Sequence, residues 1–180
     1  MLKKSFLIFM GLFLLTSTLY SAKYFELKEV LKKIIPASQK VFQNKVELTK
    51  EQSDYLNKTW DGRYIKGDKF TIYYSKDEKT NVSCYAVEMA EILEKYKSYH
   101  RFLIAFDAAR KIKQVFIMEL QDDHAILINV PVFYNQFTNR DPTTNFNFPK
   151  NIDGISGATK SSRLMVDSIK KAYYILTLLK

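Results

Sequence analysis

The chain has 180 residues, of which 47% are apolar and 26% charged, and its formal net charge is +9. This size and composition predict one principal domain with an ordinary core, and they exclude a disordered or collagen-like chain. The single cysteine, Cys84, excludes an intramolecular disulfide framework and an all-cysteine metal site. The lysines are spread over short stretches rather than gathered in one basic block. That spread favours a solvated surface and argues against a nucleic-acid-binding protein.

Residues 1–22 have the order of charge and hydrophobicity that is typical of an export segment. Lys3 and Lys4 precede an uncharged run over 6–15, and the segment ends on small residues at Ser21 and Ala22. This order predicts a secretory signal peptide. Counted through Ala22, the segment almost reaches the length of a membrane span, so a retained anchor remains the alternative. In both cases we expect the rest of the chain to be exported, either periplasmic or anchored to the outer face of the cytoplasmic membrane.

The N-terminal part of the domain, residues 23–80, contains two predicted helices and one predicted strand. Apolar residues at helical spacing predict a helix over 26–34, which Pro36 stops. Thr49 and Gln52 have the spacing of a capping box, which predicts a short helix to about residue 58. Alternation over 70–74 predicts a strand that turns at 76–79.

The returning strand and a hairpin follow this turn. Alternation over 82–86 predicts the returning strand, whereas helix and strand periods both fit residues 88–97. Two apolar runs, 101–106 and 112–120, are joined by the short connection 107–111 and predict a β-hairpin. Residues 125–130 are predicted to add another strand.

Pro131 suits the first position of a helix that continues to about residue 137. Residues 139–152 show no period and form the longest predicted loop. A strong helix is predicted from about Ser161, with an apolar stripe that leaves Lys170, Lys171 and Asp167 off it; the stripe is Met165, Ile169, Ala172, Leu176 and Leu179. The fold class predicted from these elements is α+β, an antiparallel sheet of about five strands flanked by helices.

The segment between the long loop and the last helix has the composition of a phosphate-binding loop. Small residues let a ligand approach the main chain, and Gly157 can adopt a positive φ that points successive N–H groups one way. The following helix N-terminus favours an anion. Hydroxyls and cations surround this point, at Thr159, Lys160, Ser161, Ser162 and Arg163. On these grounds alone, a turn that only caps the helix remains an equal alternative.

Two common phosphate motifs do not fit this segment. A Walker loop needs glycine directly before Lys160, where Thr159 stands, and a Rossmann fingerprint needs a third glycine besides Gly154 and Gly157.

The order Asp153-x-x-Ser156-Gly157-Ala158-Thr159, with Ser161 two residues later, resembles the flavinylation motif of the FMN-binding domain family. That family includes flavinylated subunits of the sodium-pumping NADH:quinone reductase and of Rnf-type complexes, and free-standing exported proteins. The resemblance covers roughly residues 80–180, so that residues 81–180 are expected to be the FMN-binding domain. The hairpin turn at 107–110 lacks the glycine that members commonly have, which favours a divergent stand-alone member.

The resemblance implies that FMN is attached through its phosphate to the hydroxyl of Thr159. A separate FAD:protein FMN transferase, which uses a divalent metal, would carry out this attachment and recognise Asp153, Gly157 and Ala158. The remaining cofactor contacts are expected at Ser156, Lys160, Ser161 and Ser162. Four aromatic residues are candidates for stacking on the flavin ring, with core packing as the alternative for each: Tyr134, Phe137, Phe146 and Phe148.

The function implied is that of an electron carrier between a membrane donor and an extracytoplasmic acceptor. No catalytic group or metal site is predicted. His100 and His124 are isolated in the sequence, and residues 122–124 are interpreted as a polar turn. Cys84 is interpreted as a small buried residue. Two alternatives remain open: an exported binding or scaffold module of the same fold without flavin, and a small reductase that uses FMN on a bound organic acceptor.

Overall fold

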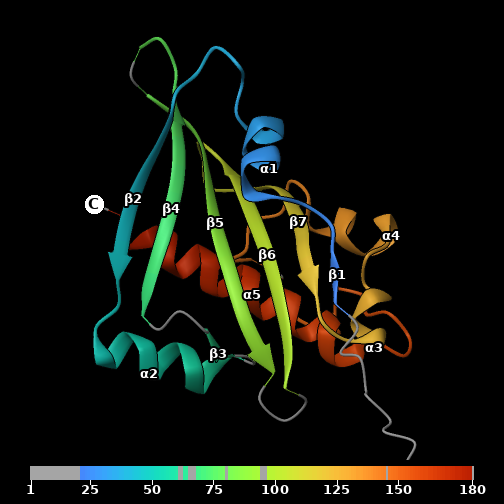
Figure 1. Cartoon of the computed structure of the whole chain (residues 1–180). Helices are drawn as coiled ribbons and strands as arrows, with labels where there is room; N and C mark the ends of the chain where they lie inside the picture. Colours follow the sequence, from blue (N-terminus) through green and yellow to red (C-terminus); the bar gives the residue numbers. More distant parts are fainter. Residues whose placement is uncertain are drawn as a thin grey trace, which may run out of the picture.

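The computed structural model describes residues 21–60, 63–64, 68–79, 81–93, 97–144 and 146–179. An antiparallel sheet lies between helices on its two faces (Figure 1), which confirms the predicted α+β class. The predicted export segment lies outside these residues except for Ser21 and Ala22. Within the described part of the chain, every helix is too short or too polar to cross a membrane.

The sheet has seven strands among the described residues, in the spatial order β1-β7-β6-β5-β4-β2, with β3 pairing with β5 outside this path. All the paired strands are antiparallel. Because β4 to β7 follow one another in sequence and in space, they form a meander. The strands are β1 Ala22–Lys23, β2 Val41–Glu47, β3 Arg63–Tyr64, β4 Lys69–Lys76, β5 Val82–Leu93, β6 Ser98–Asp107 and β7 Ile112–Leu120.

Two helices cover opposite faces of this sheet. Helix α5 crosses one face, while α1 lies on the other; α3 and α4 stand on the side of the sheet where β1 and β7 lie (Figure 1). The helices are α1 Leu27–Ile34, α2 Lys50–Thr59, α3 Asp123–Ile126, α4 Pro131–Tyr134, the 3-10 turn η2 Asn135–Phe137 and α5 Thr159–Thr177.

The two faces of the sheet bury separate hydrophobic clusters, as strand alternation requires. On β6, Phe102, Ile104 and Phe106 belong to the larger cluster with α5, whereas Leu103 and Ala105 belong to the smaller cluster with α1. Thus β6 is buried on both faces, which explains why it reads as a continuous apolar run in the sequence.

A buried ion pair ties α5 to the sheet. Lys171 Nζ lies 2.9 Å from Glu91 Oε1, and the Ser168 hydroxyl is 2.6 Å from the other carboxylate oxygen. Lys171 is only 3% exposed, so its predicted position off the buried stripe was wrong. A lysine can be buried here because β5 supplies a carboxylate for its charge.

The structure also decides the described part of the segment 88–97, whose hydrophobic period fitted both a helix and a strand; residues 94–96 lie outside the described residues. The strand β5 continues to Leu93 and carries two buried carboxylates, Glu88 on one face and Glu91 on the other. Arg101 of β6 holds Glu88 through its Nε and Nη2 atoms. Charged residues at inward positions therefore obscured the strand pattern.

The prediction of a strand over 125–130 was wrong. The structure has α3 there, because the Asp122 side chain accepts a hydrogen bond from the Ala125 N–H and caps a helical turn. Helix α5 also begins at Thr159, two residues before the predicted start. In addition, β2 was not predicted: it is an edge strand with mostly exposed side chains and no apolar alternation.

The other predicted elements are confirmed. Helix α1, the capping box of α2, the β4–β5 pair and the β6–β7 hairpin lie where the patterns placed them. Pro131 is the first residue of α4, and the described residues of 139–152 contain no helix or strand.

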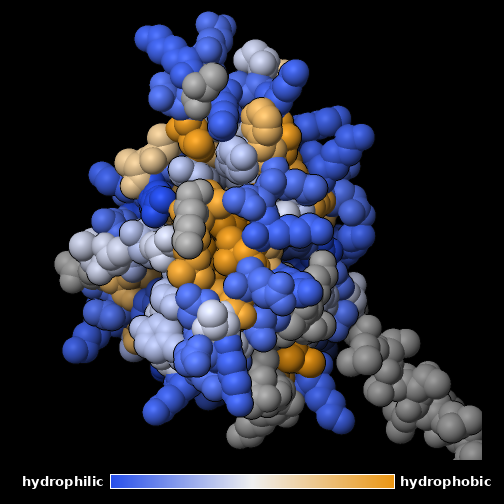
Figure 2. Space-filling view, turned by 90° about the vertical axis from the view of Figure 1, so that its left-hand side faces the viewer, coloured by the Kyte–Doolittle hydropathy of each residue, from blue (hydrophilic) through white to orange (hydrophobic). Residues whose placement is uncertain are grey.

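The side of the molecule that carries β2 has a mixed surface. Figure 2 shows a mostly hydrophilic face with an apolar strip through its middle. Two exposed apolar residues of β2, Val41 and Phe42, are 49% and 40% exposed.

Candidate functional site

The motif segment forms the turn that leads into α5, at the end of that helix nearest α3 (Figure 1). Gly157 has a φ of +80°, a conformation that side-chain-bearing residues rarely adopt, and Ala158 occupies the N-cap position. The tight turn places Thr159 at the first position of the helix.

The motif residues divide into an exposed and a buried group. Five of them lie at the surface: Asp153, Ser156, Gly157, Thr159 and Lys160. Three are buried, with 2%, 3% and 0% of their surface exposed: Ala158, Ser161 and Ser162. The Thr159 side chain is therefore open to an incoming group, while the two serines after it turn toward the protein interior.

Three side chains, two of them from outside the motif, hold the backbone of this segment. The Gln136 amide donates to the Asp153 carbonyl and accepts from the Asp153 N–H, both at 2.9 Å. Arg140 Nη1 donates to the Asn151 carbonyl at 2.8 Å. From the helix side, Ser162 Oγ accepts a hydrogen bond from the Ile155 N–H at 3.1 Å.

The two glycines of this segment leave room for neighbouring side chains. A Cβ on Gly154 would lie 2.9 Å from two ring carbons of Phe148, and one on Gly157 would lie 3.3 Å from Leu127 Cδ1. The Arg163 guanidinium is 5.3 Å from the centre of the Phe148 ring, so Phe148 is contacted by both the loop and the helix.

The N-terminus of α5 suits a phosphate group. Ala158 has no side chain that could cap the helix, and the first turn contains no acidic residue. The first backbone N–H groups of a helix have no partner inside it and carry its positive dipole end. With Lys160 exposed in the first turn, this end can stabilise the single negative charge of a phosphodiester.

The four aromatic candidates for flavin stacking do not share one environment. Phe137 and Phe146 are 0% and 3% exposed and pack against each other, which confirms core packing for both. Tyr134 and Phe148 are half-buried, and their contact with a flavin remains a prediction.

The isolated histidine His100 is buried in a short hydrogen-bonded chain. Its Nε2 lies 2.8 Å from Ser98 Oγ, which donates in turn to Asp122 Oδ2 at 2.9 Å. Because the Ser98 hydrogen goes to Asp122, the Nε2 atom of a neutral imidazole must donate. Burial lowers the pKa of His100 to about 4, although the nearby Asp122 carboxylate acts in the opposite direction.

The remaining candidate residues have ordinary surroundings. Cys84 is 2% exposed in β5, as predicted, and its Sγ is 3.1 Å from Ser75 Oγ. His124 is exposed on α3. In the described ranges no three histidine, cysteine, aspartate or glutamate side chains gather where they could hold a metal ion.

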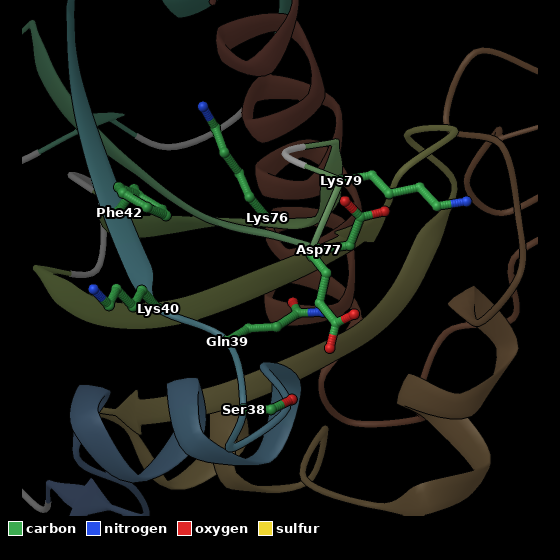
Figure 3. A pocket seen from close by; sticks show the side chains of 8 residues that line it. Ser38, Gln39, Lys40, Phe42, Lys76, Asp77 and Lys79 are labelled. Carbon is green, nitrogen blue, oxygen red and sulfur yellow. The ribbon is translucent and has the colours of Figure 1, made fainter.

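A large hollow of about 650 Å³ lies elsewhere, at the β4–β5 turn (Figure 3). Its lining mixes charges of both signs, and the Lys40 and Lys79 side chains point away from each other. The ammonium of Lys76 is instead 5.6 Å from the centre of the Phe42 ring. None of the described residues that line this hollow belongs to the motif, so it is not part of that site.

Sequence reasoning missed Gln136, Arg140 and Leu127 as parts of the site. Gln136 binds a backbone segment 17 residues away, and the two come together only when η2 and the loop are folded against each other. Leu127 was assigned to a strand, whereas the structure places it, 44% exposed, at the C-terminal end of α3 beside Gly157.

Comparison with known proteins gives one family. Residues 96–174 match a family described as FMN-binding domain. The matched range begins just before β6 and includes the β6–β7 hairpin, α3, α4, the motif and most of α5. No curated protein and no solved structure gave a match.

Proposed function

Residues 96–174 belong to the FMN-binding domain family, and from this premise we propose that the protein carries FMN covalently on Thr159 and transfers electrons outside the cytoplasm. The observation that carries the proposal is the exposed Thr159 hydroxyl at an uncapped helix N-terminus, within a segment of the motif's order. The bound FMN would supply the redox chemistry, and the protein would supply attachment and orientation.

The attachment would use a FAD:protein FMN transferase. In that reaction Thr159 Oγ forms a bond to the phosphorus on the FMN side of FAD, the bond from this phosphorus to the bridging oxygen breaks, and AMP leaves. The hydroxyl proton is released. The α5 N-terminus and Lys160 then stabilise the remaining negative charge.

The other proposed roles follow from the exposed and buried groups of the motif. The exposed carboxylate of Asp153 and the bare backbone at Gly157 are available to the transferase. Ser156 and the backbone N–H of Ser161 in the first helical turn complete the proposed surroundings of the phosphate. The buried hydroxyl of Ser162 contributes indirectly, because it braces the loop.

We place the protein in an exported setting on the pattern of residues 1–22. Its partners would be a membrane-bound electron donor and an extracytoplasmic acceptor protein. Covalent attachment suits this setting, because a lost flavin could not be replaced there.

Co-production with the transferase tests the attachment. Wild-type protein should gain the mass of one FMN less one water, and should show flavin absorbance that bleaches on chemical reduction and returns on oxidation. Thr159→Ala should gain nothing, whereas Ser156→Ala, which removes the other exposed hydroxyl of the motif, should still accept flavin. A wild type without adduct, or an equal adduct on Thr159→Ala, would falsify the proposal.

A further inference from the structure

A cleft beside the C-terminal half of α5 is lined by four aromatic side chains that the flavin site does not use. Three separate parts of the chain form its walls: Trp60 after α2, Phe146 in the long loop, and Tyr173 and Tyr174 on α5. Its volume is about 360 Å³, within the range of ~300–1,000 Å³ that is usual for small-molecule sites.

The aromatic rings are held in place from behind. Tyr55 of α2 contacts both Trp60 and Tyr174, with ring centres 5.8 and 5.6 Å apart. The other two rings are braced by fully buried phenylalanines, in the pairs Tyr173–Phe106 and Phe146–Phe137, at 6.3 and 5.7 Å. The walls are therefore formed before any ligand arrives, which lowers the entropic cost of binding.

The described lining of the cleft carries a positive charge. Lys170, one turn before Tyr174 on the same face of α5, is the one charged side chain among the described lining residues. No ion pair holds its ammonium within the described ranges. The cleft thus combines two features. Its aromatic rings attract other aromatic rings in offset or edge-to-face contact, and the Lys170 ammonium can pair with an anionic group.

We propose that this cleft binds a small planar aromatic compound that carries an anionic group. The rings of Trp60 and Tyr174 contact the faces or edges of its ring system, and Lys170 pairs with its anion. The site lies some four turns along α5 from Thr159, so it is separate from the flavin attachment and does not depend on it.

Fluorescence offers a direct test, because Trp60 is the only tryptophan of the chain. Anthraquinone sulfonate, a planar anion, is titrated into flavin-free protein, and a neutral hydroxymethyl anthraquinone serves as the uncharged counterpart. The expected result is saturable quenching of Trp60 by both compounds, with tighter binding of the sulfonate.

Three variants locate the binding. Lys170→Gln should weaken the sulfonate about fivefold and leave the neutral compound unchanged. Tyr174→Ala should weaken both about tenfold. Lys45→Gln, an exposed lysine on β2, is the matched control and should bind as the wild type does. Quenching that rises linearly without saturation, or equal affinity of Lys170→Gln and wild type for the sulfonate, would overturn the proposal.

Discussion

At the scale of single residues, the shape of the motif depends on a side chain outside it. Gln136 reaches the Asp153 backbone from η2, where the neighbouring Phe137 is fully buried and packs against Phe133. The anchored helical turn fixes the amide, and the amide fixes the loop. The exposed Asp153 carboxylate is thereby held at a set position beside the helix that begins with Thr159.

We expect Gln136→Ala to slow flavin attachment about tenfold, since it removes two hydrogen bonds worth about 1 kcal/mol each at most positions. The measurement is the initial rate of flavin incorporation at limiting transferase, followed by covalent fluorescence. Gln43→Ala, which removes an exposed glutamine from β2, is the control. A rate for Gln136→Ala equal to that of the control would contradict the role of the amide.

His100 makes stability depend on pH. Its pKa is about 4 in the folded protein and 6.5 in the unfolded chain, so the unfolded chain binds the proton first as the pH falls. The stability contributed by the neutral imidazole is thus complete above pH 6.5 and is lost as the pH falls toward 4, by about 3 kcal/mol. Burial raises the pKa of the cross-strand neighbour Glu91, which acts in the opposite direction.

Comparison with His100→Gln cancels the contribution of Glu91, because that residue is present in both proteins. The free energy of unfolding is measured in urea for both proteins at pH 7 and at pH 4. The stability of the wild type relative to the variant should be about 3 kcal/mol lower at pH 4 than at pH 7. A difference that stays constant over this range would show that His100 does not titrate with a lowered pKa.

At the scale of elements, local patterns predicted what local interactions determine. The Thr49–Gln52 capping box lies within four residues, and the β6–β7 hairpin closes through a short turn, so both were visible in the sequence. Partners far away in the chain decided the rest. Glu91 lies 80 residues before Lys171, and the hydrophobic period of α5 does not indicate that a lysine is buried.

The site follows the same division. The sequence placed the glycine turn and the start of α5 to within two residues, because both depend on neighbours. The inward orientation of Ser162 could not be predicted from the sequence. Its hydroxyl accepts a hydrogen bond from the Ile155 N–H, and these two groups meet only when the loop folds back over the helix.

The Lys171–Glu91 ion pair between α5 and β5 should contribute to stability, but a pair of neutral side chains should be able to replace most of that contribution. Lys171→Met leaves Glu91 buried without its counter-charge, and we expect a loss of about 3–5 kcal/mol in the free energy of unfolding at pH 7. Adding Glu91→Gln, which keeps a group that can bond Ser168, should recover more than half of that loss. Urea denaturation measures both; a single variant that loses less than about 1 kcal/mol would contradict the pairing.

At the scale of the whole molecule, the sheet and helix α5 connect the proposed attachment residue with the aromatic cleft. The regions 23–80 and 81–180 share this sheet, because β4 pairs directly with β5, and α5 packs across it. The proposed attachment residue opens α5, and the aromatic cleft lies about 21 Å further along it, at Tyr173. The two proposals therefore concern two separate positions on α5, a covalent flavin at its first residue and a reversibly bound ring compound beside its C-terminal half.

The most direct test is the position of the flavin in the flavinylated protein. Trypsin should release residues 151–160, which contain the hydroxyls of Ser156 and Thr159 but not those of Ser161 and Ser162. Fragmentation of this peptide in a mass spectrometer should place the FMN phosphoryl group on Thr159. A flavin on Ser156, or on the following peptide with Ser161 and Ser162, would contradict the account.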